Sequence, residues 1–134
     1  MPNILFLCVA NSARSQMAEG LARATAPAGY GFLSAGSEPG ALNPLAVQAL
    51  AEQGIDISHH RAKGLPDIPL AEVDTIVTLC AEEVCPVAPG NVRRVHWPLP
   101  DPGRARGSEA EQLAAFREVR DRLKELVPSL WNTP

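Results

Sequence analysis

The sequence predicts an α/β fold in which a parallel sheet carries helices on both faces. Short apolar runs typical of buried strands alternate with segments of helical periodicity, and turns rich in glycine and proline separate them. No repeat or linker interrupts this alternation. With 134 residues, of which 46% are hydrophobic, the chain is long enough to bury one core. We therefore expect a single domain over residues 1–134.

The first half of the chain predicts two strands and two helices. Residues 3–8 form a continuous apolar run, as in a strand that is buried on both faces of a parallel sheet. Residues 15–26 place apolar side chains at helical spacing, and residues 30–35 predict a second strand. Asn43 and Pro44 are typical of a helix start, with Asn as the cap and Pro at the first helical position.

The second half predicts two more strands and the clearest helix. Residues 55–61 indicate a polar loop or short strand, and the proline-containing segment 66–72 has room for one helical turn. Residues 74–80 and 92–97 predict the third and fourth strands. Residues 108–127 place large apolar side chains along one face of a helix.

Composition excludes several classes of function. The net charge of −3 gives no electrostatic reason to expect a nucleic-acid partner, and no apolar run has the length of a membrane span. The N-terminus reads as a first strand and not as an export signal, so we expect a cytoplasmic protein. In that reducing compartment, three cysteines indicate chemistry or redox activity rather than a structural disulfide scaffold.

The most informative segment is the octapeptide Cys8-Val-Ala-Asn-Ser-Ala-Arg-Ser15, which lies between the first strand and the first helix. Backbone N–H groups of such a loop, together with the positive end of the helix, cradle a phosphate-type anion. Cys8 is the expected nucleophile, because the positive field favours the reactive thiolate. Arg14 can grip two oxygens of the anion. The expected oxyanion-binding residues are Val9, Ala10, Asn11, Ser12, Ala13 and Arg14.

Two residues of this segment have further expected roles. Ser15 can donate a hydrogen bond to a Cys8 thiolate. Asn11 is a residue type that tolerates left-handed backbone geometry, and its small neighbours let the backbone close around a ligand. The alternative interpretation is a buried structural cysteine at a strand end, which the attached Asn-Ser-x-Arg-Ser run disfavours.

Two further cysteines lie at and just after the end of the third predicted strand. Cys80 and Cys85 are five positions apart, which is not a zinc-binding spacing. In a regular helix these positions do not share a face, so a disulfide between them requires the segment to unwind or loop. Two unrelated buried thiols are the alternative interpretation. Because Cys8 and Cys80 both end strands of one parallel sheet, both can reach one crevice.

Asp101 is a candidate general acid. It lies in the turn Pro100-Asp101-Pro102-Gly103, just beyond the fourth strand, where a carboxylate can overhang the crevice. Taken alone, a turn-forming aspartate is the favoured interpretation of this residue.

Taken together, these residues resemble the thioredoxin-coupled arsenate reductases of the low-molecular-weight protein tyrosine phosphatase superfamily. The resemblance implies a four-stranded parallel sheet. The sequence departs from the family pattern at Ala10, where glycine is frequent, and in a shorter gap between Cys80 and Cys85. The matching stretches cover nearly the whole chain: Cys8–Gly20, Ser34–Gly36, Asn43-Pro44, Ile55–Ser58, Val77–Cys80, Cys85-Pro86, His96-Trp97 and Asp101-Pro102.

The resemblance implies that arsenate is reduced to arsenite by a relay of three thiols. Cys8 attacks arsenic, and Asp101 protonates the departing oxygen. Cys80 then attacks Cys8, and Cys85 attacks Cys80. Thioredoxin finally reduces the exposed Cys80–Cys85 disulfide. The same resemblance makes Asn11 a brace for the loop and Ser15 a stabiliser of the thiolate.

The resemblance also bears on cations. Some members bind potassium through an Asn, a Glu, a Ser and an Asp; Asn11, Glu19 and Ser34 match the first three, whereas Lys63 stands in place of the Asp. We expect the Lys63 ammonium to replace the cation, so that activity does not need potassium. Separately, we expect no metal and no tightly bound cofactor. His60 matches a family position near the redox segment and is assigned a minor supporting role.

Three other functions stay open at this point. A phosphatase of the same fold, acting on phosphotyrosine or a small phosphoester through Cys8, Arg14 and Asp101, is the main alternative, and weak phosphatase activity is expected in any case. The others are an anion-binding or arsenic-sensing protein, and a reductase coupled to a low-molecular-weight thiol. The expected partners are arsenate, with phosphate or sulfate as mimics, and thioredoxin, with the protein acting as a monomer.

Overall fold

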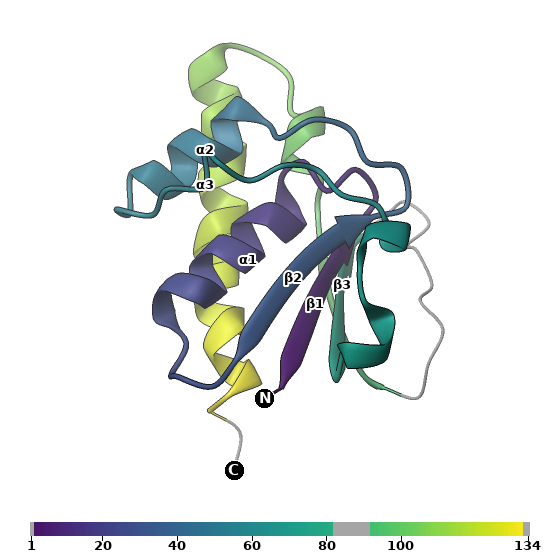
Figure 1. Ribbon diagram of the computed structural model, residues 1–134. Coiled ribbons are helices and arrows are strands. Elements are labelled where there is room, and N and C mark those ends of the chain that lie inside the picture. The colour runs from purple at the N-terminus through teal and green to yellow at the C-terminus, as the bar shows by residue number, and fades with distance from the viewer. Residues whose placement is uncertain (1, 82–91, 133–134) are drawn as a thin grey trace.

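A computed structural model describes residues 2–81 and 92–132, which form a four-stranded sheet flanked by helices (Figure 1). The strand order is β2-β1-β3-β4, and all three neighbouring pairs are parallel. The predicted parallel α/β sheet is therefore confirmed. The strands are β1 (Asn3–Cys8), β2 (Gly31–Gly36), β3 (Thr75–Cys80) and β4 (Arg93–Leu99).

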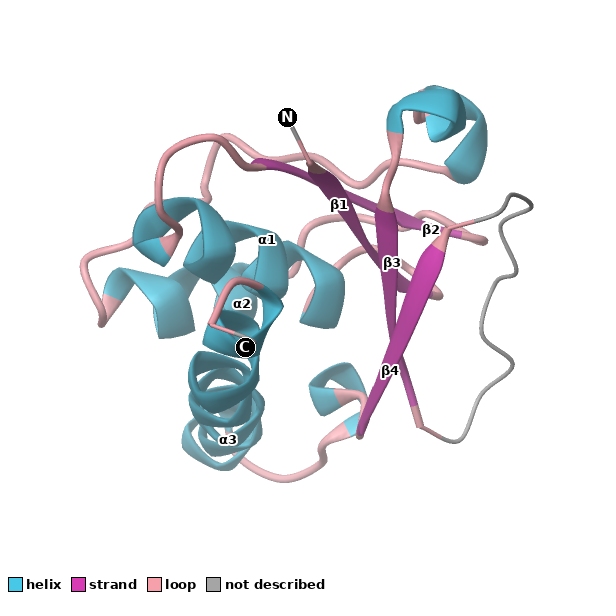
Figure 2. Ribbon diagram, turned by 90° about the horizontal axis from the view of Figure 1, so that it is seen from below, coloured by secondary structure: helices cyan, strands magenta, loops and turns pink. Residues whose placement is uncertain are grey.

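Helices cover both faces of the sheet, as predicted (Figure 2). Three α-helices lie on one face: α1 (Arg14–Thr25), α2 (Pro44–Ala51) and α3 (Glu109–Leu126). The short 3₁₀ helices η1 (Leu65–Asp67) and η2 (Leu70–Glu72) lie on the other, while η3 (Pro102–Arg104) and η4 (Val127–Leu130) flank α3. Within residues 2–81 and 92–132, no helix combines the length and apolar character needed to span a membrane.

The apolar run in β1 reflects its central place in the sheet. Ile4 and Phe6 pack into the core beneath the α-helices, whereas Leu5 and Leu7 pack into a smaller core beneath η1 and η2. All four side chains are at most 3% exposed. A strand that is buried on both faces needs apolar residues at every position, which is the pattern that predicted it.

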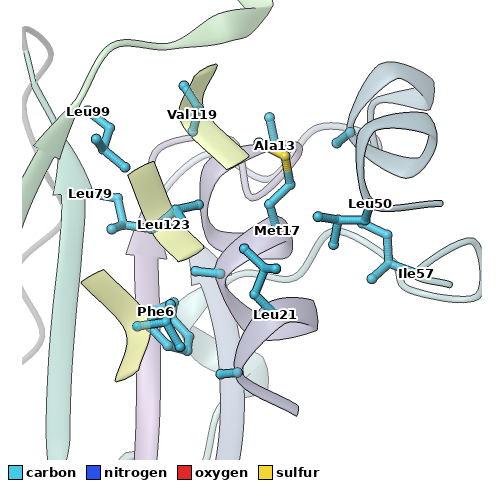
Figure 3. Close-up of a cluster of buried hydrophobic side chains, with 14 of the residues drawn as sticks. Phe6, Ala13, Met17, Leu21, Leu50, Ile57, Leu79, Leu99, Val119 and Leu123 are labelled. Carbon is cyan, nitrogen blue, oxygen red and sulfur yellow. The ribbon is translucent and has the colours of Figure 1, made fainter. Parts of the chain in front are cut away.

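The larger core fixes α1 against the sheet (Figure 3). Phe6 from β1, Met17 from α1, Leu50 from α2 and Leu123 from α3 are completely buried in this cluster. Truncating such a side chain to alanine typically costs about 2–5 kcal/mol, because it leaves a cavity. This packing holds the start of α1 beside the end of β1, where the cysteine loop lies.

The three α-helices begin in different ways. At α2, the side chain of Asn43 accepts a hydrogen bond from the Leu45 N–H at 2.9 Å, as the predicted cap should. At α3, Ser108 and Glu111 form a capping box. At α1 the N-cap is Ala13, and no side chain caps the helix there. The first turn of α1 therefore meets the cysteine loop without a capping side chain between them.

The sheet places this loop at a topological switch point. Leu7 of β1 pairs with Thr78 of β3, so the carboxyl ends of these strands lie side by side. The chain leaves β1 towards β2 on one side, whereas β3 lies on the other side. Ligands of open α/β sheets bind outside the carboxyl ends of the strands at such a point.

The boundaries of the four strands, of α1 and of α3 agree with the predictions to within two residues, whereas α2 ends at Ala51, before the predicted end at Gly54. The fourth strand extends to Leu99, and the segment predicted to hold one helical turn contains η1 and η2. The pairing of β3 with β4 shifts register between Thr78 and Cys80, an irregularity that apolar periodicity does not reveal.

Candidate active site

Residues 9–13 form a tight loop around a cavity of about 210 Å³, with Cys8 at the end of β1. Cys8 is a free cysteine, and only 2% of its surface is exposed. A buried thiol at the base of a small cavity is placed to react with a ligand held above it. The cavity is lined by Cys8, Val9, Ala10, Ser12, Ala13, Arg14, Asp101 and Arg104.

The backbone of the loop presents N–H groups to this cavity. Three of its carbonyls point outwards and accept hydrogen bonds from residues 38–43. Because a trans peptide is planar, the N–H that follows each of these carbonyls points the opposite way, into the loop. Such converging N–H groups bind anions. The outward bonds join Val9 O to Glu38 N at 2.9 Å, Ala10 O to Gly40 N at 3.0 Å, and Ser12 O to Asn43 N at 2.9 Å.

Asn11 provides the turn that closes the loop. Its φ is 51°, and among the described residues it is the one non-glycine residue with a positive φ. Asparagine adopts this left-handed geometry more readily than most residues, which agrees with the expectation from the sequence. The residue is completely buried, so its side chain must find polar partners inside the protein.

Gly36, at the end of β2, lets the loop approach the sheet. A Cβ atom on Gly36 would lie 2.3 Å from the Val9 carbonyl oxygen and 2.9 Å from the Asn11 nitrogen. Both atoms belong to the backbone of the loop and cannot move aside without distorting it. The position therefore requires glycine because of close approach between two segments.

Ser15 connects the loop to the nucleophile. Its Oγ lies 2.8 Å from the Cys8 Sγ and accepts a hydrogen bond from the Asn11 Nδ2, also at 2.8 Å. A hydroxyl that accepts from an amide still has its own proton to donate. The contact with Cys8 is thus suited to stabilise a thiolate.

Arg14 is oriented by the sheet. Its Nη1 donates to the carbonyl oxygens of Leu99 at 3.0 Å and Leu79 at 3.4 Å, at the ends of β4 and β3. The residue is only 3% exposed and lines the cavity. A guanidinium fixed in this way presents a planar, charged fork to a tetrahedral oxyanion.

Asp101 lines the same cavity as Cys8. It caps η3, with its Oδ1 accepting a hydrogen bond from the Gly103 N–H at 2.9 Å. Its Oδ2 lies 3.8 Å from the Nε of Arg104, and 28% of the side chain is exposed. Asp101 therefore shapes the turn and also places a carboxylate at the cavity.

A larger groove of about 510 Å³ adjoins the anion cavity and shares Asp101 and Arg104 with it. The rest of its lining comes from the end of β3, from the segment that runs from the end of β4 through η3, and from one side of α3. These residues are Ala81, Pro98, Leu99, Pro100, Pro102, Ala105, Ala115, Glu118, Val119 and Arg122.

Cys80 ends β3, where it pairs with Leu99 of β4. It is 2% exposed, does not line the Cys8 cavity, and is disulfide-bonded in this structure. The predicted second thiol of the relay therefore lies on the neighbouring strand to Cys8 but outside the cavity. Cys85, the predicted third thiol, lies outside the described residues.

The residues that match the potassium site of the resembled family lie close together. Lys63 and Ser34 both approach Glu19, and the Lys63 N–H donates to Asn11 Oδ1. The Glu19 carboxylate accepts hydrogen bonds from Ser34 Oγ and from Arg23 Nε, the latter at 2.9 Å. The Lys63 Nζ lies 4.0 Å from Glu19 Oε1, and burial lowers the pKa of this lysine. Among the described residues, no group of three or more His, Cys, Asp or Glu side chains is arranged to hold a metal ion.

One buried residue of the site was not anticipated. Gln16, the third residue of α1, is completely buried and contacts both Asn11 and His60 through hydrogen bonds. Neither the position of Gln16 on a helix nor its residue type distinguishes it from an ordinary surface glutamine. Its role depends on His60, which is 44 positions away in the sequence.

Comparison with known proteins agrees with this geometry. The arsenate reductase of Bacillus subtilis is 47% identical over 128 residues, which cover 91% of this chain and 92% of that protein. An arsenate reductase solved in a phosphate binding state superposes with a TM-score of 0.81 at 30% identity, covering 97% of this chain and 96% of that one.

The thioredoxin-dependent arsenate reductase of Corynebacterium glutamicum superposes with a TM-score of 0.71 at 31% identity, covering 97% of this chain and 62% of that chain. The family model for low molecular weight phosphotyrosine protein phosphatases matches residues 3–133. Loop, sheet order and sequence therefore agree, and the chain belongs to the low molecular weight phosphotyrosine protein phosphatase family.

Proposed function

We propose that this chain is an enzyme that reduces arsenate to arsenite, with Cys8 as the nucleophile. The observation that carries the proposal is the presence of two buried cysteines on neighbouring strands. Cys8 is free and lines an anion cavity, and Cys80 lies at the end of the adjacent strand. The similarity to arsenate reductases over nearly the whole chain supports it.

In the first step, arsenate binds in the loop and the Cys8 thiolate attacks arsenic. An S–As bond forms, and an As–O bond breaks. Asp101 donates the proton that lets the departing oxygen leave as water, while Arg14 and the loop N–H groups neutralise the oxyanion. The position of Asp101 at the cavity supports this role.

In the second step, the Cys80 thiolate attacks the Cys8 sulfur. A Cys8–Cys80 disulfide forms, the S–As bond breaks, and its electron pair stays on arsenic. Arsenic(V) thereby becomes arsenic(III), which leaves as arsenite, and the two thiols supply the two electrons. Hydrolysis of a phosphate ester needs no such second thiol, so the presence of Cys80 favours reduction.

In the third step, Cys85 attacks Cys80, which frees Cys8 and moves the disulfide away from the loop. Thioredoxin then reduces the Cys80–Cys85 disulfide by thiol–disulfide exchange. A thioredoxin-dependent reductase among the structural relatives supports this choice of electron donor. We expect the enzyme to act as a monomer in the cytoplasm, where thioredoxin is kept reduced.

The second candidate function is hydrolysis of a small phosphoester through Cys8, Arg14 and Asp101. Family membership and the groove beside the anion cavity favour it, because the groove offers space for the organic part of an ester. Phosphate and arsenate have the same shape and similar charge, so the loop alone accepts both.

The decisive assay is arsenite formation under multiple turnover with thioredoxin, thioredoxin reductase and NADPH. We expect the wild type to turn over, and Cys80→Ser and Cys85→Ser each to stall after at most one cycle. Hydrolysis of an aryl phosphate, measured in parallel, depends on Cys8 and not on the other two cysteines. Full turnover by both serine variants would exclude the relay, and brisk ester hydrolysis without NADPH oxidation would favour the phosphatase.

A further inference from the structure

A continuous network of hydrogen bonds runs from the partly buried His60 through buried side chains to the nucleophile. The His60 Nδ1 lies 2.9 Å from Gln16 Oε1, and Gln16 Nε2 lies 2.9 Å from Asn11 Oδ1. Asn11 Nδ2 then donates to Ser15 Oγ, which contacts Cys8 Sγ, each at 2.8 Å. Gln16, Asn11 and Ser15 are each completely buried, so water cannot replace any of these partners.

The contacts of Asn11 decide which atom donates and which accepts in this hydrogen-bond network. Its Oδ1 accepts from the backbone N–H of Lys63 at 2.8 Å as well as from Gln16. A backbone N–H can only donate, so the oxygen of the Asn11 amide must face Lys63 and its nitrogen must face Ser15. Ser15 consequently accepts from Asn11, and its single proton points to the sulfur of Cys8.

Gln16 can take only one orientation as well. Its Nε2 faces three acceptors: the Arg61 carbonyl at 2.8 Å, the Asn11 carbonyl at 3.1 Å and Asn11 Oδ1. A flipped amide would turn its oxygen towards all three oxygens and lose these bonds inside the protein, where an unpaired polar group costs about 1–3 kcal/mol. Its Oε1 must therefore face His60 and accept.

His60 can donate at either protonation state. Because Gln16 Oε1 only accepts, the His60 Nδ1 must carry a proton, and titration takes place at Nε2. Burial lowers the pKa of His60, as do the positive charges of Lys63 and Arg23 and the neighbouring His59, whereas the Glu19 carboxylate raises it. The bond to Gln16 thus persists when the ring gains its second proton.

We propose that Gln16 is a positioning residue for the Cys8 nucleophile, held in its orientation by His60. Gln16 fixes the Asn11 amide, and this amide directs the Ser15 proton to the Cys8 sulfur. Gln16 and His60 therefore stabilise the thiolate without touching the substrate. The proposal rests on Cys8 being the nucleophile but not on arsenate being the substrate.

The test is the pH dependence of Cys8 alkylation. At each pH, Cys8 is alkylated with a short pulse of iodoacetamide in oxyanion-free buffer, and the modified fraction is measured by peptide mass mapping. Gln16→Met keeps the length and burial of the side chain but removes every hydrogen bond. We expect the pH midpoint of Cys8 alkylation to rise by about one unit, equivalent to a tenfold loss of thiolate stabilisation. In arsenate turnover, kcat should fall about tenfold while KM changes less than about threefold.

Two comparisons separate positioning from a merely structural effect. Val127→Ala removes buried methyl groups from the core at η4, so it should lower the melting temperature but leave the alkylation midpoint unchanged. His60→Asn retains a donor nitrogen near the place of Nδ1 and should keep the wild-type midpoint, whereas His60→Leu should raise it.

Because His60 is only partly buried, its variants test the proposal even where Gln16→Met folds poorly. An unchanged midpoint in both Gln16→Met and His60→Leu would overturn the proposal. Equal shifts in His60→Asn and His60→Leu would overturn the role of His60. Alkylation does not require arsenate, so these outcomes are independent of whether the chain reduces it.

Discussion

Arg14 at the start of α1 donates a hydrogen bond to the carbonyl oxygen of Leu99 at the end of β4, over 3.0 Å. The segment that follows Leu99 carries Asp101, which lines the same cavity as Arg14. One stretch of chain therefore orients the guanidinium and supplies the carboxylate. A change that displaces the end of β4 is expected to disturb both.

Arg14→Lys should lower kcat/KM for arsenate by about 10²–10³-fold. Lysine keeps the charge but lacks the planar fork that can contact Leu99 and two oxyanion oxygens together. Steady-state arsenate reduction measures the effect. Arg93→Lys, at an exposed position on β4, is the matched control and should behave like the wild type. A loss of less than about threefold in Arg14→Lys would contradict the assigned geometry.

Asp101→Asn separates the two interpretations of Asp101. Asparagine keeps a side-chain oxygen for the Gly103 N–H, so the turn at η3 should persist and the melting temperature should stay near that of the wild type. The proton donor is lost, so kcat should fall by about 10²-fold. A variant with full kcat would leave Asp101 as a turn residue alone. Asp101→Ala, which loses both functions, should be less stable as well as slow.

Gly36→Ala should distort the anion loop, because the new Cβ would meet the backbone of Val9 and Asn11. We expect a loss of about 1–3 kcal/mol in the free energy of unfolding and weaker phosphate binding. Gly40→Ala is the matched control, since the nearest atom to its Cβ is the Ala10 Cβ at 3.9 Å. Denaturant unfolding and phosphate titration should distinguish the two, and identical behaviour would disprove the close-approach argument.

Glu52→Gln should destabilise the protein in a pH-dependent manner. The hydrogen bond from Arg117, aided by Arg120, lowers the pKa of Glu52 from 4.5 to about 2. A depressed carboxyl pKa stabilises the folded state above pH 4.5, and this contribution is lost as the pH falls from 4.5 towards 2. Wild type and variant should therefore differ at pH 7 and converge in acid.

The size of the Glu52 effect is limited by solvent and salt, because 31% of its side chain is exposed. Added salt should accordingly narrow the difference at pH 7. Glu125→Gln is the control: its partner Arg122 is 3.7 Å away, and both side chains are more than half exposed. This variant should show no comparable pH dependence in urea unfolding.

Potassium should affect neither the rate nor the melting temperature of the wild type, when KCl and NaCl are compared at equal ionic strength. We expect the Lys63 ammonium, whose Nζ lies 4.0 Å from Glu19 Oε1, to take the place of the cation. Lys63→Asp should create a dependence on potassium, visible as a higher melting temperature in KCl. Lys124→Asp, on α3, controls for the change in net charge. A large potassium effect on the wild type would refute the replacement of the cation by Lys63.

The strands and helices were predictable because each carries its own pattern. The apolar run in β1 and the cap at Asn43 depend only on neighbouring residues, and the cysteine loop is a contiguous motif. Gly36 and Gln16 were assigned no role, since their importance arises from contacts with Val9 and His60, which are distant in the sequence. No local pattern encodes such contacts, and the same holds for the register shift before Cys80.

Helix α1 has no capping side chain at Ala13, unlike α2 and α3. A tetrahedral anion in the loop would accept hydrogen bonds from the first N–H groups of α1, as the side chains of Asn43 and Ser108 do at α2 and α3. The bound anion would then act as the N-terminal cap that no side chain provides for α1. Arsenate and phosphate would each serve as the cap of α1, so either anion should stabilise the folded protein as well as fill the cavity.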